Sequence, residues 1–274
     1  LHAHHNGAER TESWSYRSAV GILIYLARNT RPDIEHAVHQ CARFQINPKR
    51  AHEMAIKRIS RYLNGSKERG ITFRPNERLL SSIGCYVDAY FAGAYSKEHS
   101  HDPNSVKSRT GCVIMYAGCP ILWFSRLQQE ISLSTTEAEY IALSTAAREI
   151  LPMRDLLVEI SSQFGIQEIT PNVRCTIFED NVGAEILAKS PKMTPRTKHL
   201  AIKCHHFKTK VNKTLFVKRV NTHDQLDDIF TKAVPKPILI KLRKEIQGWL
   251  SIMWKPKDNQ NEQKRLYANL SYKL

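Results

Sequence analysis

Four acidic residues have the type and the placement to bind a divalent metal ion. One is Glu139, which begins a stripe at helical spacing whose other members are apolar: Leu143, Ala146 and Ile150. A carboxylate on a core-facing stripe needs a cationic partner, a metal ion or a raised pKa. The other three are aspartates beside the ends of predicted elements: Asp88, Asp180 and Asp228.

The elements that carry the aspartates indicate how they come together. Asp88 ends one predicted strand, Asp180 ends another, and Asp228 begins a short predicted helix. If the two strands are neighbours, Asp88 and Asp180 meet at one sheet edge, which is the usual ligand position in open α/β sheets. Four carboxylates without a His/Cys set form an all-oxygen site suited to magnesium. Two such ions ~3.5–4 Å apart promote in-line displacement at phosphorus.

Each acid also has an ordinary structural explanation. Asp180 together with Asn181 is typical of a helix N-cap, and Asp88 is typical of a turn. Asp228 complements the dipole of a first helical turn, and Glu139 can pair with an arginine. The order of the four acids and the elements that carry them favour the metal site.

The chain is strongly basic. Its 274 residues include 41 Lys+Arg against 26 Asp+Glu, which gives a net charge of +15. This excess favours a polyanionic partner, nucleic acid rather than a membrane, although a solubilising basic surface also accounts for it. A hydrophobic fraction of 42% with 24% charged residues is typical of a globular protein with one large domain or two small ones.

Neither a membrane span nor a disulfide framework is expected. No stretch is long and apolar enough to cross a bilayer, and the N-terminal residues lack a signal-peptide core, so we expect a protein that is not secreted. The six cysteines are scattered without a C-x-x-C pair, as is usual in a reducing compartment. The chain starts without Met, so we expect it to be a piece of a longer protein.

The first 70 residues predict a polar segment followed by a helical piece. We expect disorder over residues 1–13 and a helical piece over 14–70, with helices at 16–29, from Pro32, and from Pro48 to Asn64-Gly65. The third helix is basic and has three candidate contacts to a phosphate backbone: Lys57, Arg58 and Arg61. A solvated basic face explains these three residues equally well.

Residues 80–234 predict a mixed sheet with helices packed against it, in the order β-β-β-α-β-α-α-β-α. Ala117-Gly118 forms a turn, so the first three strands make an antiparallel meander. Ser134 and Glu137 form a capping box, with the serine oxygen accepting from the Glu137 N–H and the glutamate reaching back to the N-cap amide. Pro152 introduces a kink. The expected strands are 82–88, 110–116, 120–125, 172–178 and 214–220, and the expected helices are 134–165, 182–189, 197–211 and 225–232. Residues 235–274 are expected to form a last amphipathic helix, which includes residues 239–253, and a flexible tail.

Several motifs make the chain resemble a known family. The motifs are Y-V-D-A-Y-F-A-G (86–93), S-R-T-G-C-V (108–113), L-S-T-T-E-A-E-Y-I-A-L-S (133–144), E-D-N-V-G-A (179–184), T-K-H-L-A-I-K-C-H-H-F (197–207) and D-Q-L-D-D-I-F-T-K (224–232). In this order they resemble the ribonuclease H domain of copia-type retrotransposon Pol polyproteins. Residues 16–34 and 55–66 resemble the end of the reverse transcriptase in the same polyprotein. The resemblance extends over residues 14–234.

The resemblance implies a ribonuclease H-like fold with a five-stranded mixed sheet, and hydrolysis of the RNA strand of RNA–DNA hybrids by a two-metal mechanism. It implies Mg²⁺ or Mn²⁺ as cofactor, and the reverse transcriptase portion of the polyprotein as partner. The location implied is the cytoplasm, in a virus-like particle, or the nucleus. The family's metal-binding catalytic acids correspond to Asp88, Glu139, Asp180 and Asp228. For the glutamate, this agrees with the helical stripe.

The chain departs from the family pattern at several positions. The aspartate that usually follows K-H-I is Ala201 here, and the aromatic residue of the first motif is Phe91. Asp227 replaces an alanine and competes with Asp228 as a ligand. Only His223 is available as a proton shuttle, against the alternative of a plain surface histidine.

Further residues are candidate nucleic-acid contacts, namely Asn181, Lys198 and Lys203. A zinc site built from Cys204 and the nearby histidines is disfavoured, because only His199 and His206 share a helical face.

Two other functions compete with the nuclease. One is a degenerate or co-opted fragment that binds nucleic acid without cutting it, which Ala201 and Asp227 favour. The other is DNA strand transfer, which usually relies on acids in the order D-D-E, whereas the glutamate here falls between aspartates. The chain has no Y-x-D-D motif, so polymerase activity is not expected, and the helical piece is thumb- or connection-like. Hybrid recognition would rest on 2′-hydroxyls and groove shape.

Overall fold

The chain is built around a five-stranded mixed sheet. The computed structural model describes residues 7–95, 97, 102, 104–166, 173–190 and 205–248. The strand order is β3-β2-β1-β4-β5, with β1 (Ser82–Tyr90), β2 (Arg109–Tyr116), β3 (Cys119–Leu127), β4 (Arg174–Glu179) and β5 (Leu215–Arg219). The first three strands are antiparallel neighbours, and β4 lies parallel to both β1 and β5. The predicted meander is confirmed, and the strands that carry Asp88 and Asp180 are neighbours, which was the condition for a shared site.

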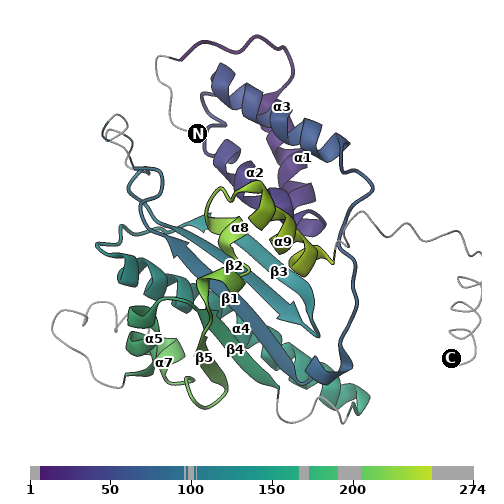
Figure 1. The fold of residues 1–274 in the computed structure, drawn as a ribbon, viewed down its shortest axis with the longest axis vertical. Coiled ribbons are helices and arrows are strands. Elements are labelled where there is room, and N and C mark those ends of the chain that lie inside the picture. The colour runs from purple at the N-terminus through teal and green to yellow at the C-terminus, as the bar shows by residue number, and fades with distance from the viewer. Residues whose placement is uncertain are drawn as a thin grey trace, which may run out of the picture.

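One face of the sheet is packed against the long helix α4 (Thr135–Phe164), which lies behind the sheet in Figure 1. The predicted capping box begins this helix: the Glu137 N–H donates to Ser134 Oγ at 3.1 Å. The Glu137 carboxylate accepts from the Leu133 N–H at 2.8 Å, one residue before the amide that was predicted. The helix runs through Pro152 and ends at Gly165, as predicted, with a φ of +64° at the glycine.

The main core lies between α4 and the sheet. The helices α5 (Val182–Lys189) and α7 (His205–Lys208) also cover this face, beside α4. Glu139 is 6% exposed, and the apolar members of its stripe are fully buried, as predicted. These apolar members are Leu143, Ala146 and Ile150.

The opposite face of the sheet is packed against α8 (Asp228–Thr231) and α9 (Lys236–Gln247), which cross in front of it in Figure 1. A second core lies under these helices and includes Trp123, Phe230 and Leu242. The predicted final helix was expected to continue to residue 253, but α9 ends at Gln247. Gly248 follows with a φ of +69°, and the Gln247 carbonyl oxygen accepts from the Thr72 N–H at 3.0 Å.

The N-terminal helices are α1 (Tyr16–Asn29), α2 (Glu35–Ala42) and α3 (Arg50–Asn64), and they have a core of their own. Pro32 begins a 3₁₀ turn (Pro32–Ile34) before α2, where an α-helix was predicted. The helical piece docks on β3 and α8 through α2. The Trp123 Nε1–H donates to the Ala27 carbonyl oxygen at 2.8 Å, so a strand residue satisfies one of the last carbonyls of α1.

A buried carboxylate ties this helical piece to the end of the chain. Asp33 accepts from Arg31 through both carboxylate oxygens, each at 2.9 Å. The same carboxylate accepts from the Tyr62 hydroxyl on α3 and from Gln247 Nε2 on α9, the latter at 3.2 Å. Arg243 on α9 in turn donates to the Tyr62 hydroxyl at 2.7 Å. We call this group of five residues the Asp33 node.

Two predicted helices are shorter in the structure. The helix expected over 225–232 is limited to Asp228–Thr231, because Gln225 is extended and its Nε2–H donates to the Val87 carbonyl oxygen at 2.9 Å. Of the helix expected over 197–211, residues 205–208 are helical, and positions 197–204 lie outside the described residues. Across the described ranges, no helix is both long and apolar enough to span a membrane.

Replacing Trp123 by phenylalanine tests how firmly the helical piece is attached. The substitution leaves the Ala27 carbonyl without its donor, and we expect the free energy of unfolding to fall by about 1–3 kcal/mol in urea titrations. Tyr25→Phe is a suitable control, because it removes a hydroxyl from a side chain on α1 that is 68% exposed. Equal stability of the two variants would show that the Trp123 contact does not contribute.

Candidate active site

Three carboxylates from separate elements meet beside β1. Asp88 lies within β1, two residues before its end, Asp180 directly follows β4, and Glu139 lies in the first turns of α4. One carboxylate oxygen of each lies within 4.8 Å of the others, a grouping that could hold a metal ion. The parallel pairing of β1 with β4 brings the two aspartates together.

Each of these carboxylates accepts a hydrogen bond from a neighbouring segment. Glu139 Oε2 accepts from the Ala89 N–H at 2.7 Å. Asp88 Oδ2 accepts from the Thr231 hydroxyl on α8, and Asp180 Oδ2 accepts from the Thr222 hydroxyl, both at 2.9 Å. The site is therefore held by α8 and by the turn before it, as well as by the elements that carry the acids.

A glycine in β2 permits the close approach of α8. Gly111 pairs with Asp88 across the antiparallel ladder. A Cβ atom at this position would lie 2.6 Å from Thr231 Cγ2 and 3.2 Å from the Asp227 carbonyl oxygen. A larger residue would push α8 away from the sheet, and Thr231 would no longer reach Asp88.

The two adjacent aspartates at α8 have different surroundings. Asp228 begins α8, and its Oδ1 lies 2.6 Å from Lys232 Nζ. Burial raises the pKa of Asp228, the ion pair with Lys232 opposes this, and the charges of Asp88 and Asp180 add to the increase. Asp228 thus borders the three-carboxylate group without belonging to it. Asp227 is fully buried, and neither of its carboxylate oxygens has a hydrogen-bond partner in the part of the chain that the structure describes.

The cluster is strongly acidic and poorly solvated. Burial is the main cause that raises the pKa of Glu139 well above its ordinary value, and the negative charge of Asp88 is the next. Burial likewise raises the pKa of Glu179 and of Asp227. A divalent cation would offset this repulsion. The all-oxygen donor set and the unpartnered buried oxygens of Asp227 and Glu179 fit such an ion.

The structure places the predicted nucleic-acid contacts in three kinds of position. On α3, Lys57 pairs with Glu12 at 2.6 Å and with Glu53 at 3.1 Å, so its charge is already compensated. Arg58 and Arg61 are exposed and form no ion pair with the residues that the structure describes. Asn181 is the N-cap of α5, and its Oδ1 accepts from the Ala184 N–H at 3.0 Å. Lys198 and Lys203 lie outside the described residues, as do Ala201, His199 and Cys204.

The predicted proton shuttle lies next to the site. His223 is exposed and belongs to the 3₁₀ turn Thr222–Asp224. Its neighbour Thr222 is the residue that bonds to Asp180. Sequence reasoning gave no role to Thr222, Thr231 or Glu179. Two of them are common small polar residues near element ends, and nothing in their local pattern marks them as partners of a distant carboxylate.

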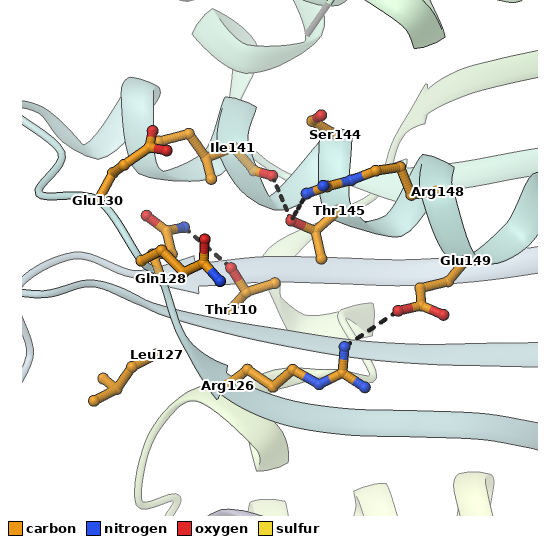
Figure 2. A pocket seen from close by; sticks show the side chains of 11 residues that line it. Thr110, Arg126, Leu127, Gln128, Glu130, Ile141, Ser144, Thr145, Arg148 and Glu149 are labelled. Carbon is orange, nitrogen blue, oxygen red and sulfur yellow. Dashed lines mark hydrogen bonds and ion pairs between the residues drawn. The ribbon is translucent and has the colours of Figure 1, made fainter. Parts of the chain in front are cut away.

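A cavity of about 440 Å³ lies between the ends of β2 and β3 and the first half of α4, and neither Asp88 nor Glu139 is among its described lining residues. Figure 2 shows its polar side chains bonded to one another: Arg126 Nη1 lies 3.2 Å from Glu149 Oε1, and Gln128 Nε2 donates to Thr110 Oγ1 at 3.0 Å. Both signs of charge line this cavity, and its ion pair is internal. It is therefore not an extension of the acidic cluster.

Comparison with known proteins finds sequence relatives over most of the chain. The chain is 36% identical over 233 residues to the retrovirus-related Pol polyprotein from transposon RE1 of Arabidopsis thaliana, which is 85% of this chain and 15% of that protein. It is 36% identical over 234 residues to the retrovirus-related Pol polyprotein from transposon TNT 1-94 of Nicotiana tabacum, again 85% of this chain and 16% of that protein. The chain thus spans about one sixth of the length of these relatives or less. No protein-family model matches it.

Among solved structures, LC11-RNase H1, isolated from compost, is similar with a TM-score of 0.40 and 18% sequence identity. The similarity covers 58% of this chain and 99% of that one.

The raised pKa of Glu139 predicts how stability depends on pH without metal. A carboxyl whose pKa is higher in the folded protein binds more protons there than in the unfolded chain once the pH exceeds its ordinary value of 4.5. The free energy of unfolding therefore falls as the pH rises above about 4.5. In EDTA, we expect Glu139→Gln to melt above the wild type by a margin that grows between pH 5 and pH 8, to on the order of 5 °C.

The control for this experiment is Glu159→Gln on the exposed face of α4, which should follow the wild type at every pH. A margin that stays constant with pH would mean that Glu139 does not carry the repulsion.

Proposed function

The chain belongs to the retrovirus-related Pol polyproteins of copia-type transposons, and on this basis we propose that it acts as their ribonuclease H, a metal-dependent endonuclease that hydrolyses the RNA strand of RNA–DNA hybrids. One observation carries the proposal: the oxygens of Asp88, Glu139 and Asp180 lie within 4.8 Å of one another. Three carboxylates from three separate elements meet in one place, which supports a shared metal site.

We assign Asp88, Glu139, Asp180 and Asp228 as the residues that hold Mg²⁺ or Mn²⁺. When bound, the metal activates a water molecule and neutralises charge on the phosphate and the leaving oxygen. The residues of the chain position this chemistry. Thr231 and Thr222 fix the carboxylates of Asp88 and Asp180 through hydrogen bonds, and the Ala89 N–H fixes Glu139. These hydrogen bonds restrict the orientations of the three carboxylates, as a preorganised site requires.

The proposed substrate accounts for the contrast between the whole chain and its site. A net charge of +15 attracts a polyanion, whereas the acidic cluster repels phosphate. A bound cation would offset the repulsion between the acidic cluster and phosphate, while the net charge of the whole chain would still attract the polyanion. Beside the cluster, Lys232 compensates Asp228, and His223 is exposed where it can exchange protons with solvent. The reverse transcriptase portion of the same polyprotein is the proposed partner.

Asp180→Asn tests the proposal on a labelled RNA–DNA hybrid with Mg²⁺. We expect the wild type to cut only the RNA strand and the variant to be slower by about a hundredfold or more, because the carboxylate charge that holds the metal is lost. Asp155→Asn is a matched control, since this side chain on α4 is 72% exposed. Binding of the hybrid without cutting by the wild type would refute the nuclease and favour a fragment that only binds nucleic acid.

A second pair of variants distinguishes the adjacent aspartates. Asp228→Asn removes a charge beside the cluster, and we expect kcat/KM to fall by roughly 10–100-fold. Asp227→Asn replaces a fully buried carboxyl that we do not assign as a metal ligand, so we expect near wild-type kcat/KM. If instead Asp227→Asn is the slower enzyme, the fourth acid is Asp227 and our assignment is wrong.

A further inference from the structure

A second cavity, of about 330 Å³, lies between the helical piece and the nuclease fold. The helical piece contributes His36, Gln40 and Arg43 to its wall, from α2 and the residue that follows it. The nuclease fold contributes Lys107 and Arg109 at the start of β2, and Lys232 after α8. Among the residues that the structure describes, no acidic residue lines it. This distinguishes it from the cavity in Figure 2, where Glu130 and Glu149 stand beside two arginines.

The positive charge of this cavity is only partly compensated. Arg43 pairs with Asp102 at 3.4 Å, and Lys232 pairs with Asp228 at 2.6 Å. Within the described ranges, neither Lys107 nor Arg109 has a carboxylate at ion-pair distance. Two cationic side chains therefore remain for an external anion.

Arg109 is the most unusual of these residues, because it is only 4% exposed. Its side chain donates one hydrogen bond, from Nη1 to Ser125 Oγ at 3.0 Å. Burial and the charge of Arg43 lower its pKa to about 10, while the charge of Glu35 acts in the opposite sense. The same positive field, together with burial, lowers the pKa of His36 to about 3, so this histidine is neutral. A buried guanidinium with no carboxylate at ion-pair distance among the described residues is costly, and its planar fork suits a phosphate.

The cavity adjoins the acidic cluster. Lys232 forms its wall and at the same time pairs with Asp228. Tyr90, another wall residue, is two positions after Asp88 on β1. A nucleic acid held at the acidic cluster presents further backbone phosphates beside it.

We propose that this cavity binds a backbone phosphate of the nucleic acid, with Arg109 and Lys107 as the anion's ligands and α2 as one of its walls. The inference rests on the proposed function, because it takes the polyanion that approaches the acidic cluster as the ligand. It gives the helical piece a direct part in holding substrate. Phosphate contacts of this kind set affinity and register without reading the base sequence.

The test is the affinity of the full chain for a fluorescein-labelled RNA–DNA hybrid at several salt concentrations, in an Asp180→Asn background that prevents cutting. We expect Lys107→Gln and Arg109→Gln each to raise Kd roughly three- to tenfold, and to reduce the slope of log K against log salt by about 0.7–0.9. Lys213→Gln is the matched control, since Lys213 is exposed at the opposite end of the sheet, before β5, and should leave both quantities unchanged.

Lys107→Gln separates an effect on binding from a folding defect. Lys107 is half-buried at the edge of the cavity and forms no ion pair with a described residue, whereas Arg109 also donates a hydrogen bond to Ser125. An unchanged Kd and salt slope for Lys107→Gln would overturn the proposal. The proposal would also be overturned if Arg109→Gln weakened binding only together with a lower Tm, because a folding defect would then explain the loss. Cleavage by the chain with Asp180 intact is measured separately. If the chain cuts the hybrid but Lys107→Gln leaves hybrid binding unchanged, the phosphate site is rejected and the nuclease is retained. If Lys107→Gln weakens binding but the chain does not cut, the phosphate site is retained and the nuclease is rejected.

Discussion

Mutual repulsion among buried carboxyl groups is the constraint on which the site depends. One carboxylate oxygen each of Asp88, Glu139 and Asp180 lies within 4.8 Å of the others in a partly buried region, where like charges are costly. The surrounding structure makes this arrangement possible. Threonine hydroxyls and a backbone N–H donate to the three carboxylates. Gly111 lets α8 lie close enough to the sheet for the Thr231 hydroxyl to donate to Asp88. The fold thus holds like charges close together, and a bound cation would offset their repulsion.

Local pattern was enough to predict the parts of the site that depend on one element. The capping box at Ser134 set the helical register, and that register directed Glu139 to the core, where the structure places it. The pairing of the strands carrying Asp88 and Asp180 was stated as a condition, and the sheet fulfils it. Whether these residues are the catalytic ligands remains a proposal. The extents of several strands and helices were also close to those observed, because apolar periodicity and turn residues act over short distances.

The features that sequence reasoning missed depend on contacts between distant segments. Gln225 was expected inside a helix, yet its side chain donates to the Val87 carbonyl, which keeps this segment extended. Glu179 and Asp227 are fully buried, although an acidic residue beside an element end is usually solvated. The docking of the helical piece on β3 through Trp123 also has no local signal. Gln225 and Trp123 each donate to a backbone carbonyl far away in the sequence, at separations of 138 and 96 residues.

The Asp33 node has a consequence for the covalent continuity of the chain. It joins α3 to α9, and Trp123 joins α1 to β3, so the segments before and after residues 67–79 are held together by buried hydrogen bonds and by packing. Most residues in that connection are exposed. A protease that cut the backbone there would divide the polypeptide but would not separate its two parts. The nicked protein would migrate as two bands on a denaturing gel and travel as a single particle through a sizing column.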